Sequence, residues 1–247
     1  MLAATWPCSR MAKTTQDVAM LTVHHLETSR SQRILWLLEE LGVPYELQRY
    51  KRNPLTRLAP AELKAVHPLG KSPVISDDGE VVAESAAIIE YLVEKYGHLA
   101  GTELAGLQPV PGTPEHRQCR FWMHYAEGSL MNWLVMKLVF GVIPTQPMPF
   151  FARPIARALC NKVQANLIDP NLQNARDFIE QHLGQHRWFA GEQLSMADFQ
   201  MSFAVEALLS RGTDAALYPH ISAYNARMQA RPAYQRAVAK GGPVIAS

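Results

Sequence analysis

The stretch that decides the fold of this chain is 66–88, which reads Val-His-Pro-Leu-Gly-Lys-Ser-Pro-Val-Ile-Ser-Asp-Asp-Gly-Glu-Val-Val-Ala-Glu-Ser-Ala-Ala-Ile. Pro73 opens a short apolar strand, where its missing N–H does least harm to strand pairing. Asp78-Gly79 is a hairpin turn signal and leads into a second short strand at 81–83. Glu84-Ser85 follow at once, and an apolar helix comes after them. The stretch therefore predicts a β-hairpin that runs directly into a helix.

The start of that helix is suited to holding an anion. The Ser85 hydroxyl and the free N–H groups of the first helical turn can bind a carboxylate. Glu84, directly before it, offers the opposite charge to an amine. A proline-started hairpin followed by an acid-serine helix start therefore makes a site for the backbone and terminal carboxylate of a small peptide.

Further elements precede this hairpin. An apolar strand is predicted at 20–26, and a helix at 29–41, where Ile34, Leu37, Leu38 and Leu41 recur on one face. Gly42 is a suitable helix stop. A second strand is predicted at 44–50, and a short helix or turn at 60–67. The order is therefore β-α-β-α-β-β-α, which resembles the thioredoxin-like module.

The remainder of the chain reads as helical. A linker rich in Gly and Pro covers 97–114, a long helix is predicted at 117–140, and an amphipathic run continues to Leu183. Ser195 and Asp198 have the spacing of a capping box, in which each side chain bonds the other's backbone N–H. Leu194 and Phe199 have the spacing of the accompanying hydrophobic staple.

Composition bounds the function. The 247 residues carry a net charge of +2, which argues against a nucleic-acid surface, and three dispersed cysteines, which suggest a reducing compartment. The most apolar run, 130–143, is interrupted by Asn132, Lys137 and Gly141 and is too short to cross a bilayer, so no membrane span is expected. Residues 1–19 lack both periodicity and a long apolar core, so we expect a flexible extension or an over-called start, and a cytoplasmic protein.

The hairpin at 71–85 and the capped helix start at 195–198, in this order, resemble the cytosolic glutathione S-transferase superfamily over residues 20–240. The sequence of residues 29–41, Ser-Arg-Ser-Gln-Arg-Ile-Leu-Trp-Leu-Leu-Glu-Glu-Leu, resembles the serine-type fungal and bacterial branch of this superfamily. The resemblance implies an α/β thioredoxin-like N-terminal domain (20–98), a linker (99–113) and an all-α C-terminal domain (114–247). It also implies a homodimer.

The implied activity is transfer of glutathione, as co-substrate, to small hydrophobic electrophiles, as in detoxification, without a cofactor or metal. A free thiol has a pKa near ~8.5, so its activation requires a hydrogen-bond donor or a helix N-terminus aimed at the sulfur. Ser29, between the first strand and the first helix, is the expected catalytic hydroxyl. Thr28 and Ser31 are alternates, because the register can slip. On local sequence alone, an ordinary helix cap is the favoured interpretation of Ser29, and the surrounding resemblance reverses that preference.

The resemblance also assigns the glutathione contacts. Lys71 neutralises the glycyl carboxylate, and the backbone of Ser72, beside a cis Pro73, pairs with the cysteinyl unit. Glu84 and Ser85 hold the γ-glutamyl amine and carboxylate. The alternatives are a trans proline, which is the commoner form, and solvated surface charges at Lys71 and Glu84.

Other readings stay open. Residues 27–30 hold no cysteine, which argues against thioredoxin-type redox chemistry. The same thiolate can reduce peroxides, so a glutathione-dependent peroxidase is one alternative, and a non-catalytic glutathione-binding module is another. His24 and His25 lack a third ligand, and the pair His124 and Glu127 lacks a second pair, so no metal site is expected. The role of Arg30 is undecided.

Overall fold

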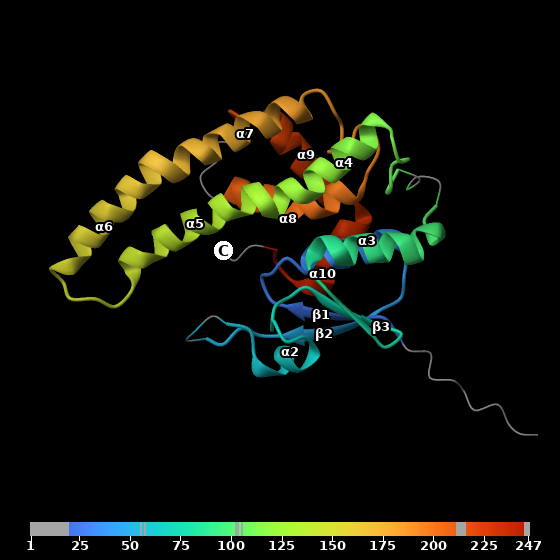
Figure 1. The fold of residues 1–247 in the computed structure, drawn as a ribbon, viewed down its shortest axis with the longest axis horizontal. Helices are drawn as coiled ribbons and strands as arrows, with labels where there is room; N and C mark the ends of the chain where they lie inside the picture. Colours follow the sequence, from blue (N-terminus) through green and yellow to red (C-terminus); the bar gives the residue numbers. More distant parts are fainter. Residues whose placement is uncertain are drawn as a thin grey trace, which may run out of the picture.

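The computed structural model describes residues 20–54, 56, 58–101, 104, 106–210 and 216–244. The expectation for residues 1–19 falls outside these described residues. Figure 1 shows two layers of structure, a small sheet with helices on its two faces and a larger group of helices above it. The predicted fold class, an α/β thioredoxin-like half followed by an all-α half, is confirmed.

The sheet has the strand order β2-β1-β3-β4. Strand β1 runs parallel to β2 and antiparallel to β3, and β3 pairs with β4 as the predicted hairpin. The sheet is therefore mixed, and the central strands β1 and β3 are its most buried part. The strands are β1 (Thr22–Leu26), β2 (Glu46–Tyr50), β3 (Val74–Asp77) and β4 (Glu80–Ala83).

Three helices belong to this half: α1 (Gln32–Leu41), α2 (Ala61–Val66) and α3 (Ser85–Tyr96). Helices α1 and α3 face the helical half, whereas α2 lies on the other side of the sheet (Figure 1). The predicted apolar stripe of α1 is fully buried, and Gly42 ends the helix with φ 66°. The start of α1 differs from the prediction, because the helix begins at Gln32 and Ser29 lies in the bend before it.

The helical half is built on two long antiparallel runs. A π-helical turn, Ala126–Leu130, joins α4 to α5, and another, Gln164–Ile168, joins α6 to α7. The remaining helices pack against the body of the protein. The bounds are α4 (Pro114–Tyr125), α5 (Met131–Val142), α6 (Ala152–Val163), α7 (Asp169–Leu183), α8 (Met196–Ser210), α9 (Pro219–Gln229) and α10 (Pro232–Gly241), with short 3-10 turns at Gly97–Leu99 and Ile143–Thr145.

Helix α8 starts at the predicted cap, but the cap is one-sided. The Asp198 carboxylate accepts the Ser195 backbone N–H at 2.8 Å, as expected of a capping box. The Ser195 hydroxyl, however, donates to the same carboxylate at 2.9 Å instead of accepting from the Asp198 N–H. Asp198 also accepts the Phe189 N–H at 2.9 Å, so one buried side chain fixes both the helix start and the preceding loop.

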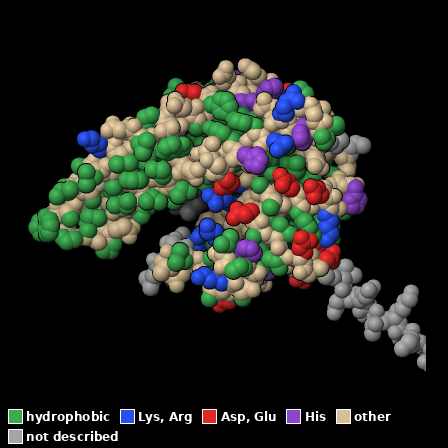
Figure 2. Space-filling model, in the orientation of Figure 1, with side chains coloured by type: hydrophobic (Ala, Val, Ile, Leu, Met, Phe, Trp, Pro, Cys, Tyr) green, Lys and Arg blue, Asp and Glu red, His purple; other side chains and the backbone are tan. Residues whose placement is uncertain are grey.

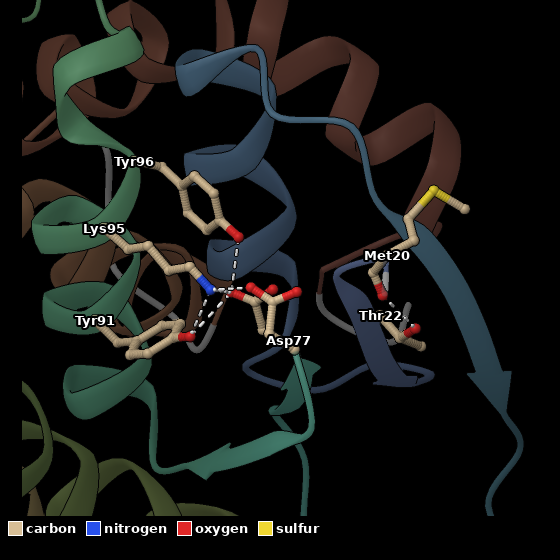
Figure 3. Close-up of polar contacts among 7 residues, drawn as sticks. Met20, Thr22, Asp77, Tyr91, Lys95 and Tyr96 are labelled. Atoms are coloured by element: carbon tan, nitrogen blue, oxygen red, sulfur yellow. Dashed lines mark hydrogen bonds and ion pairs between the residues drawn. The ribbon is translucent and has the colours of Figure 1, made fainter. Parts of the chain in front are cut away.

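The two halves share one core. The Trp36 ring on α1 lies 4.4 Å from the Phe199 ring on α8 and 5.6 Å from the Tyr234 ring on α10, measured between centroids. Within the first half, Asp77 at the end of β3 accepts hydrogen bonds from Tyr91, Lys95 and Tyr96 of α3 (Figure 3). These contacts hold the hairpin, α1 and α3 in fixed relative positions.

The helical run Pro114–Thr145, with a mean hydropathy of 1.3 in its most apolar window, has the length and composition of a membrane span. It is the one such run found among the described residues. The sequence predicted a shorter apolar segment, at 130–143. The helical run is longer in the structure because the π-helical turn continues α4 into α5 without a break. Length and composition alone are weak evidence of a span, since core helices of soluble proteins pass the same test.

Candidate active site

A small pocket at the edge of the sheet brings together all five residues expected to contact glutathione. Its walls come from the segment before β3, from the end of β4 and from the start of α3, and its volume is about 110 Å³. Two side chains from elsewhere complete it, Arg30 and Glu127. The lining residues are Arg30, His67, Leu69, Lys71, Ser72, Pro73, Ala83, Glu84, Ser85 and Glu127.

Ser72 and Pro73 form the part of the pocket next to the sheet. Their peptide bond is cis, as the resemblance implied. The Ser72 hydroxyl accepts the Leu26 N–H at 3.2 Å and donates to the His24 carbonyl at 2.9 Å. The side chain is thus used to hold the end of β1, which leaves the backbone of Ser72 as the group available to a peptide ligand.

Glu84 and Ser85 form the opposite wall. Glu84 is exposed and has φ 73°, in the left-handed region that non-glycine residues rarely adopt. Ser85 is buried, lines the pocket and is the first residue of α3, so the first N–H groups of the helix point out of the helix N-terminus at this wall. An acid beside a helix start offers partners to an amine and a carboxylate on one α-carbon.

Lys71 lies at the mouth of the pocket and is exposed. Among the described residues its ammonium group has no ion-pair partner. A solvated cation at this position can attract a carboxylate without first breaking an internal ion pair, which agrees with the role expected for it.

Arg30 and Glu127 close the pocket across the two halves. The Glu127 carboxylate, in the π-helical turn after α4, lies 3.3 Å from Arg30 and 2.9 Å from the fully buried Arg33 on α1. Arg33 also donates to Gln200 of α8 at 2.8 Å. Burial lowers the pKa of the Arg33 guanidinium to about 10, while Glu127 opposes this shift. A single carboxylate therefore neutralises a buried cation and lines the pocket.

Ser29 does not line the pocket; it precedes the lining residue Arg30 and is buried in a chain of hydrogen bonds. Its hydroxyl lies 2.8 Å from that of Ser31, which lies 2.7 Å from His25 Nδ1. His25 Nε2 lies 2.8 Å from the Gly241 carbonyl oxygen. Because a carbonyl only accepts, Nε2 donates to it, and in a neutral imidazole Nδ1 then accepts from Ser31.

This assignment fixes the direction of the Ser29 hydroxyl. Burial lowers the pKa of His25, which favours the neutral ring. Ser31 therefore donates to His25 and accepts from Ser29, whose oxygen accepts the Ser31 backbone N–H at 3.3 Å. Thr28, the other alternate, has φ 45°, a rare conformation for a β-branched residue. Of the three candidate hydroxyls, Ser29 and Ser31 act as one unit.

Comparison with known proteins shows the family of the chain. Models of the glutathione S-transferase N-terminal and C-terminal domains match residues 29–95 and 164–232. Glutathione S-transferase 3 of Schizosaccharomyces pombe is 36% identical over 222 residues, which cover 90% of this chain and 88% of that protein. The chain belongs to the glutathione S-transferase family.

Two further relatives support the same placement. Glutathione S-transferase 1 of Saccharomyces cerevisiae is 31% identical over 79% of this chain and 83% of its own length. A crystal structure of a glutathione S-transferase from Actinobacillus pleuropneumoniae has a TM-score of 0.68 and 33% identity, and covers 90% of this chain and 93% of that one. The likeness therefore extends over both halves of this glutathione S-transferase.

The sequence did not indicate two residues of the candidate site and its surroundings. Glu127 was considered only as half of a possible metal pair, and His25 as a strand residue without a third metal ligand, in a packing or surface role. Among the described residues no group of three or more His, Cys, Asp and Glu side chains is placed to hold a metal ion. Nothing in the sequence around Glu127 indicated a place in the pocket, because its neighbours there lie far away along the chain.

Proposed function

We propose that this glutathione S-transferase binds glutathione in the pocket formed by Lys71, Ser72, Pro73, Glu84 and Ser85. We further propose that it activates the thiol with the Ser29 hydroxyl, as in the serine-type branch of the family. The observation that carries the proposal is the pocket itself, which gathers five residues expected from the sequence. Its polar groups match a peptide with an amine and a carboxylate at one end and a second carboxylate at the other.

The catalytic step requires the Ser29 hydroxyl to turn. It donates to Ser31 in the structure, and it must donate to the glutathione sulfur instead to favour the thiolate. The Ser31 N–H keeps the Ser29 oxygen in place during this change. The thiol proton leaves to solvent, the sulfur forms a bond to an electrophilic carbon, and the leaving group departs with its electron pair.

The electrophile is a small apolar molecule in this proposal. The helical half reaches the pocket at Glu127, in the junction between α4 and α5, so we place the electrophile between this junction and the glutathione site. Peroxide reduction by the same thiolate is the second candidate function. A non-catalytic binding module is the third, since the pocket residues alone support binding without turnover.

The wider organisation is also a proposal. We place the glutathione-binding domain at 20–98, the linker at 99–113 and the helical domain at 114–247, in a cytoplasmic homodimer. Limited proteolysis tests the linker, because an exposed connection is cut before packed domains. The mass of the protein in solution tests the dimer.

A two-substrate assay tests the function. The purified protein is mixed with glutathione and either an activated aryl halide or an organic hydroperoxide. We expect the mass of a thioether conjugate with the aryl halide and loss of that product in Ser29→Ala. Oxidised glutathione formed only with the hydroperoxide would support the peroxidase instead. Saturable glutathione binding with neither product would leave the non-catalytic module.

A further inference from the structure

The chain of hydrogen bonds that joins Ser29, Ser31 and His25 has one direction while His25 is neutral. Nε2 of His25 donates to the Gly241 carbonyl, which leaves Nδ1 as an acceptor. Ser31 therefore donates to His25, and Ser29 donates to Ser31. The hydrogen that Ser29 needs for a bond to the glutathione sulfur is thus engaged by Ser31 in this state.

A proton on His25 reverses the direction of this chain. In the imidazolium both ring nitrogens are donors, so Nδ1 donates to the Ser31 oxygen while Nε2 keeps its bond to Gly241. The Ser31 hydroxyl no longer finds an acceptor at His25, and it donates to Ser29 Oγ, 2.8 Å away. The Ser29 oxygen accepts that bond, and its own hydrogen is released for another acceptor.

We propose that His25 is a positioning residue of this transferase, which gains a proton when the glutathione thiolate forms and thereby turns the Ser29 hydroxyl toward the sulfur. This role of His25 depends on the proposed role of Ser29. The thiol loses its proton to solvent and His25 takes one from solvent, so the net charge of the complex does not change. In the resulting chain each serine hydroxyl donates one hydrogen bond and accepts one.

The two changes of protonation assist each other. The reversed chain contains one more hydrogen bond than a chain in which Ser29 turns while His25 stays neutral. A hydrogen bond with a charged partner shifts such an equilibrium roughly tenfold or more. By linkage, the thiolate raises the pKa of His25 as much as the imidazolium lowers the pKa of the thiol.

The surroundings of His25 suit a residue that is neutral until the thiolate forms. Its side chain is buried, and burial lowers the pKa of the ring, although the bond to Gly241 opposes this shift. Arg49, at the paired position of β2, lowers the pKa further. Lys240 of α10 is paired with Glu39 of α1. A thiolate at the far end of the chain therefore supplies a counter-charge for a protonated His25.

Nitrogen NMR of the full-length protein labelled with ¹⁵N-histidine tests this role. The chain has nine histidines, so the His25 signals are assigned by their loss in His25→Gln. We expect the pKa of His25 to be about 1 unit higher with saturating glutathione than with S-methylglutathione, which cannot form a thiolate. Equal values for His25 in the two complexes, with thiolate absorbance present in the first, would overturn the proposal.

Two variants distinguish positioning from a structural role. In His25→Gln the amide can accept from Ser31 and donate to Gly241, but it cannot gain a proton. Ser29 then stays engaged by Ser31, so we expect the pKa of bound glutathione to rise by about 1 unit with an unchanged Kd. The further change Ser31→Ala removes the acceptor that holds Ser29 and should recover most of this rise. Lost packing would not be recovered by removing a second side chain.

His24→Gln is the matched control. His24 is the neighbouring buried histidine of β1, and its ring bonds Tyr50 and Ser76, outside the serine chain, so this variant should leave the thiol pKa unchanged. Melting temperatures like that of the parent protein show that the variants fold. A rise in His24→Gln, or a rise in His25→Gln that persists in the double variant, would refute the role of His25.

The Ser29→Ala variant separates this role from the proposed function. If Ser29→Ala leaves the thiol pKa unaltered, the proposed function fails and the role of His25 fails with it. If Ser29→Ala raises the thiol pKa but His25→Gln does not, only the role of His25 is refuted. A rise in both, reversed by Ser31→Ala in the His25→Gln protein, is the result that we expect.

Discussion

The thioredoxin-like half and the helical half each bury one aspartate, Asp77 and Asp198, and the two carboxyl groups lie in opposite electrostatic surroundings. Burial by itself raises the pKa of Asp77, but hydrogen bonds from Lys95, Tyr96 and Tyr91 outweigh it and hold the pKa below the usual value. Asp198 is fully buried with only neutral hydrogen-bond donors, and burial raises its pKa to about 6. The first half therefore uses a cation to fix its fold, whereas the second uses backbone N–H groups.

The same contrast extends to the proposed site. The first half carries the charged and polar groups that face the pocket, while the helical half contributes one lining side chain, Glu127. The difference suggests that glutathione affinity depends on the first half. Changes in the second half should act mainly on stability, except at Glu127, where the two halves meet.

The largest expected effect is on glutathione binding. Glu84→Ala/Ser85→Ala removes the partners of both an amine and a carboxylate, and hydrogen bonds to charged groups contribute about 1.5–3 kcal/mol each. We expect glutathione Kd, measured by calorimetry, to rise roughly a hundredfold or more, with an unchanged circular dichroism spectrum. Glu94→Ala, an exposed acid on the same helix, is the control. Normal affinity in the double variant would remove the site assignment.

The second-largest expected effect is a loss of stability at the contact between the two halves. Glu127→Ala leaves the buried Arg33 without its carboxylate, and breaking a buried ion pair costs about 3–5 kcal/mol. Because Glu127 is about one-third exposed, we expect the lower end of that range in urea unfolding. The further change Arg33→Met should recover much of the loss, since it removes the uncompensated charge. A stable Glu127→Ala variant would show that the ion pair does not join the halves.

A smaller loss is expected in the helical half. Asp198→Ala leaves the buried N–H groups of Ser195 and Phe189 without their carboxylate partner. Because water or local relaxation partly compensates, we expect the free energy of unfolding to fall by about 1–3 kcal/mol in total. The melting temperature should fall, while the glutathione Kd of the folded protein stays the same. An equal loss of glutathione affinity would contradict the division of roles between the halves.

The smallest effect concerns pH. A carboxyl whose folded pKa is raised binds a proton in the folded state first, so the Asp198 contribution to stability is lost as pH rises through about 6. Between pH 5 and 7 the loss is about 1 kcal/mol. Asp198→Asn should remove this pH dependence from the free energy of unfolding.

Asp77 should behave in the opposite way. Its lowered pKa gives a contribution that is complete above the unfolded value, about 3.9, and is lost only at lower pH as the folded carboxyl is protonated. Asp77→Asn should therefore destabilise the protein equally at pH 5 and pH 7. A pH-dependent loss in this variant would mean that Lys95 does not hold the carboxylate charged.

The elements predicted correctly are those with local signals. Asp78-Gly79 fixes the hairpin, Ser85 starts α3, and the stripe of α1 fixes the face that it buries. The first turn of α1 was placed too early, because the N–H groups of Gln32 and Arg33 bond the carbonyls of Ser29 and Arg30 three residues back, and the α-helix begins only at Gln32. These signals gave the order of the elements along the chain, β-α-β-α-β-β-α, but the strand order within the sheet comes from the structure.

The features that sequence could not provide depend on distant contacts. His25 bonds the carbonyl of Gly241, which is 216 positions away in the chain. Glu127 lies in the π-helical turn between α4 and α5, more than forty positions from the other residues that line the pocket. Nothing in the local sequence shows that apolar residues of α5 and α6, such as Val135, Leu138 and Ile155, are exposed in the structure. Figure 2 shows hydrophobic side chains gathered over these two helices.

The pKa of glutathione bound to the Ser29→Ala variant tests the central claim most directly. Thiolate absorbance, recorded as a function of pH, gives this pKa in the complex. We expect the variant to raise it by about 1–2 units, since one hydrogen bond to a charged group contributes about 1.5–3 kcal/mol, with glutathione Kd nearly unchanged. Ser31→Ala removes the acceptor of the Ser29 hydroxyl and should not raise the pKa, and Thr28→Val should leave it unchanged. An unaltered thiol pKa in Ser29→Ala, or a rise only in Thr28→Val or Ser31→Ala, would contradict the assignment of Ser29.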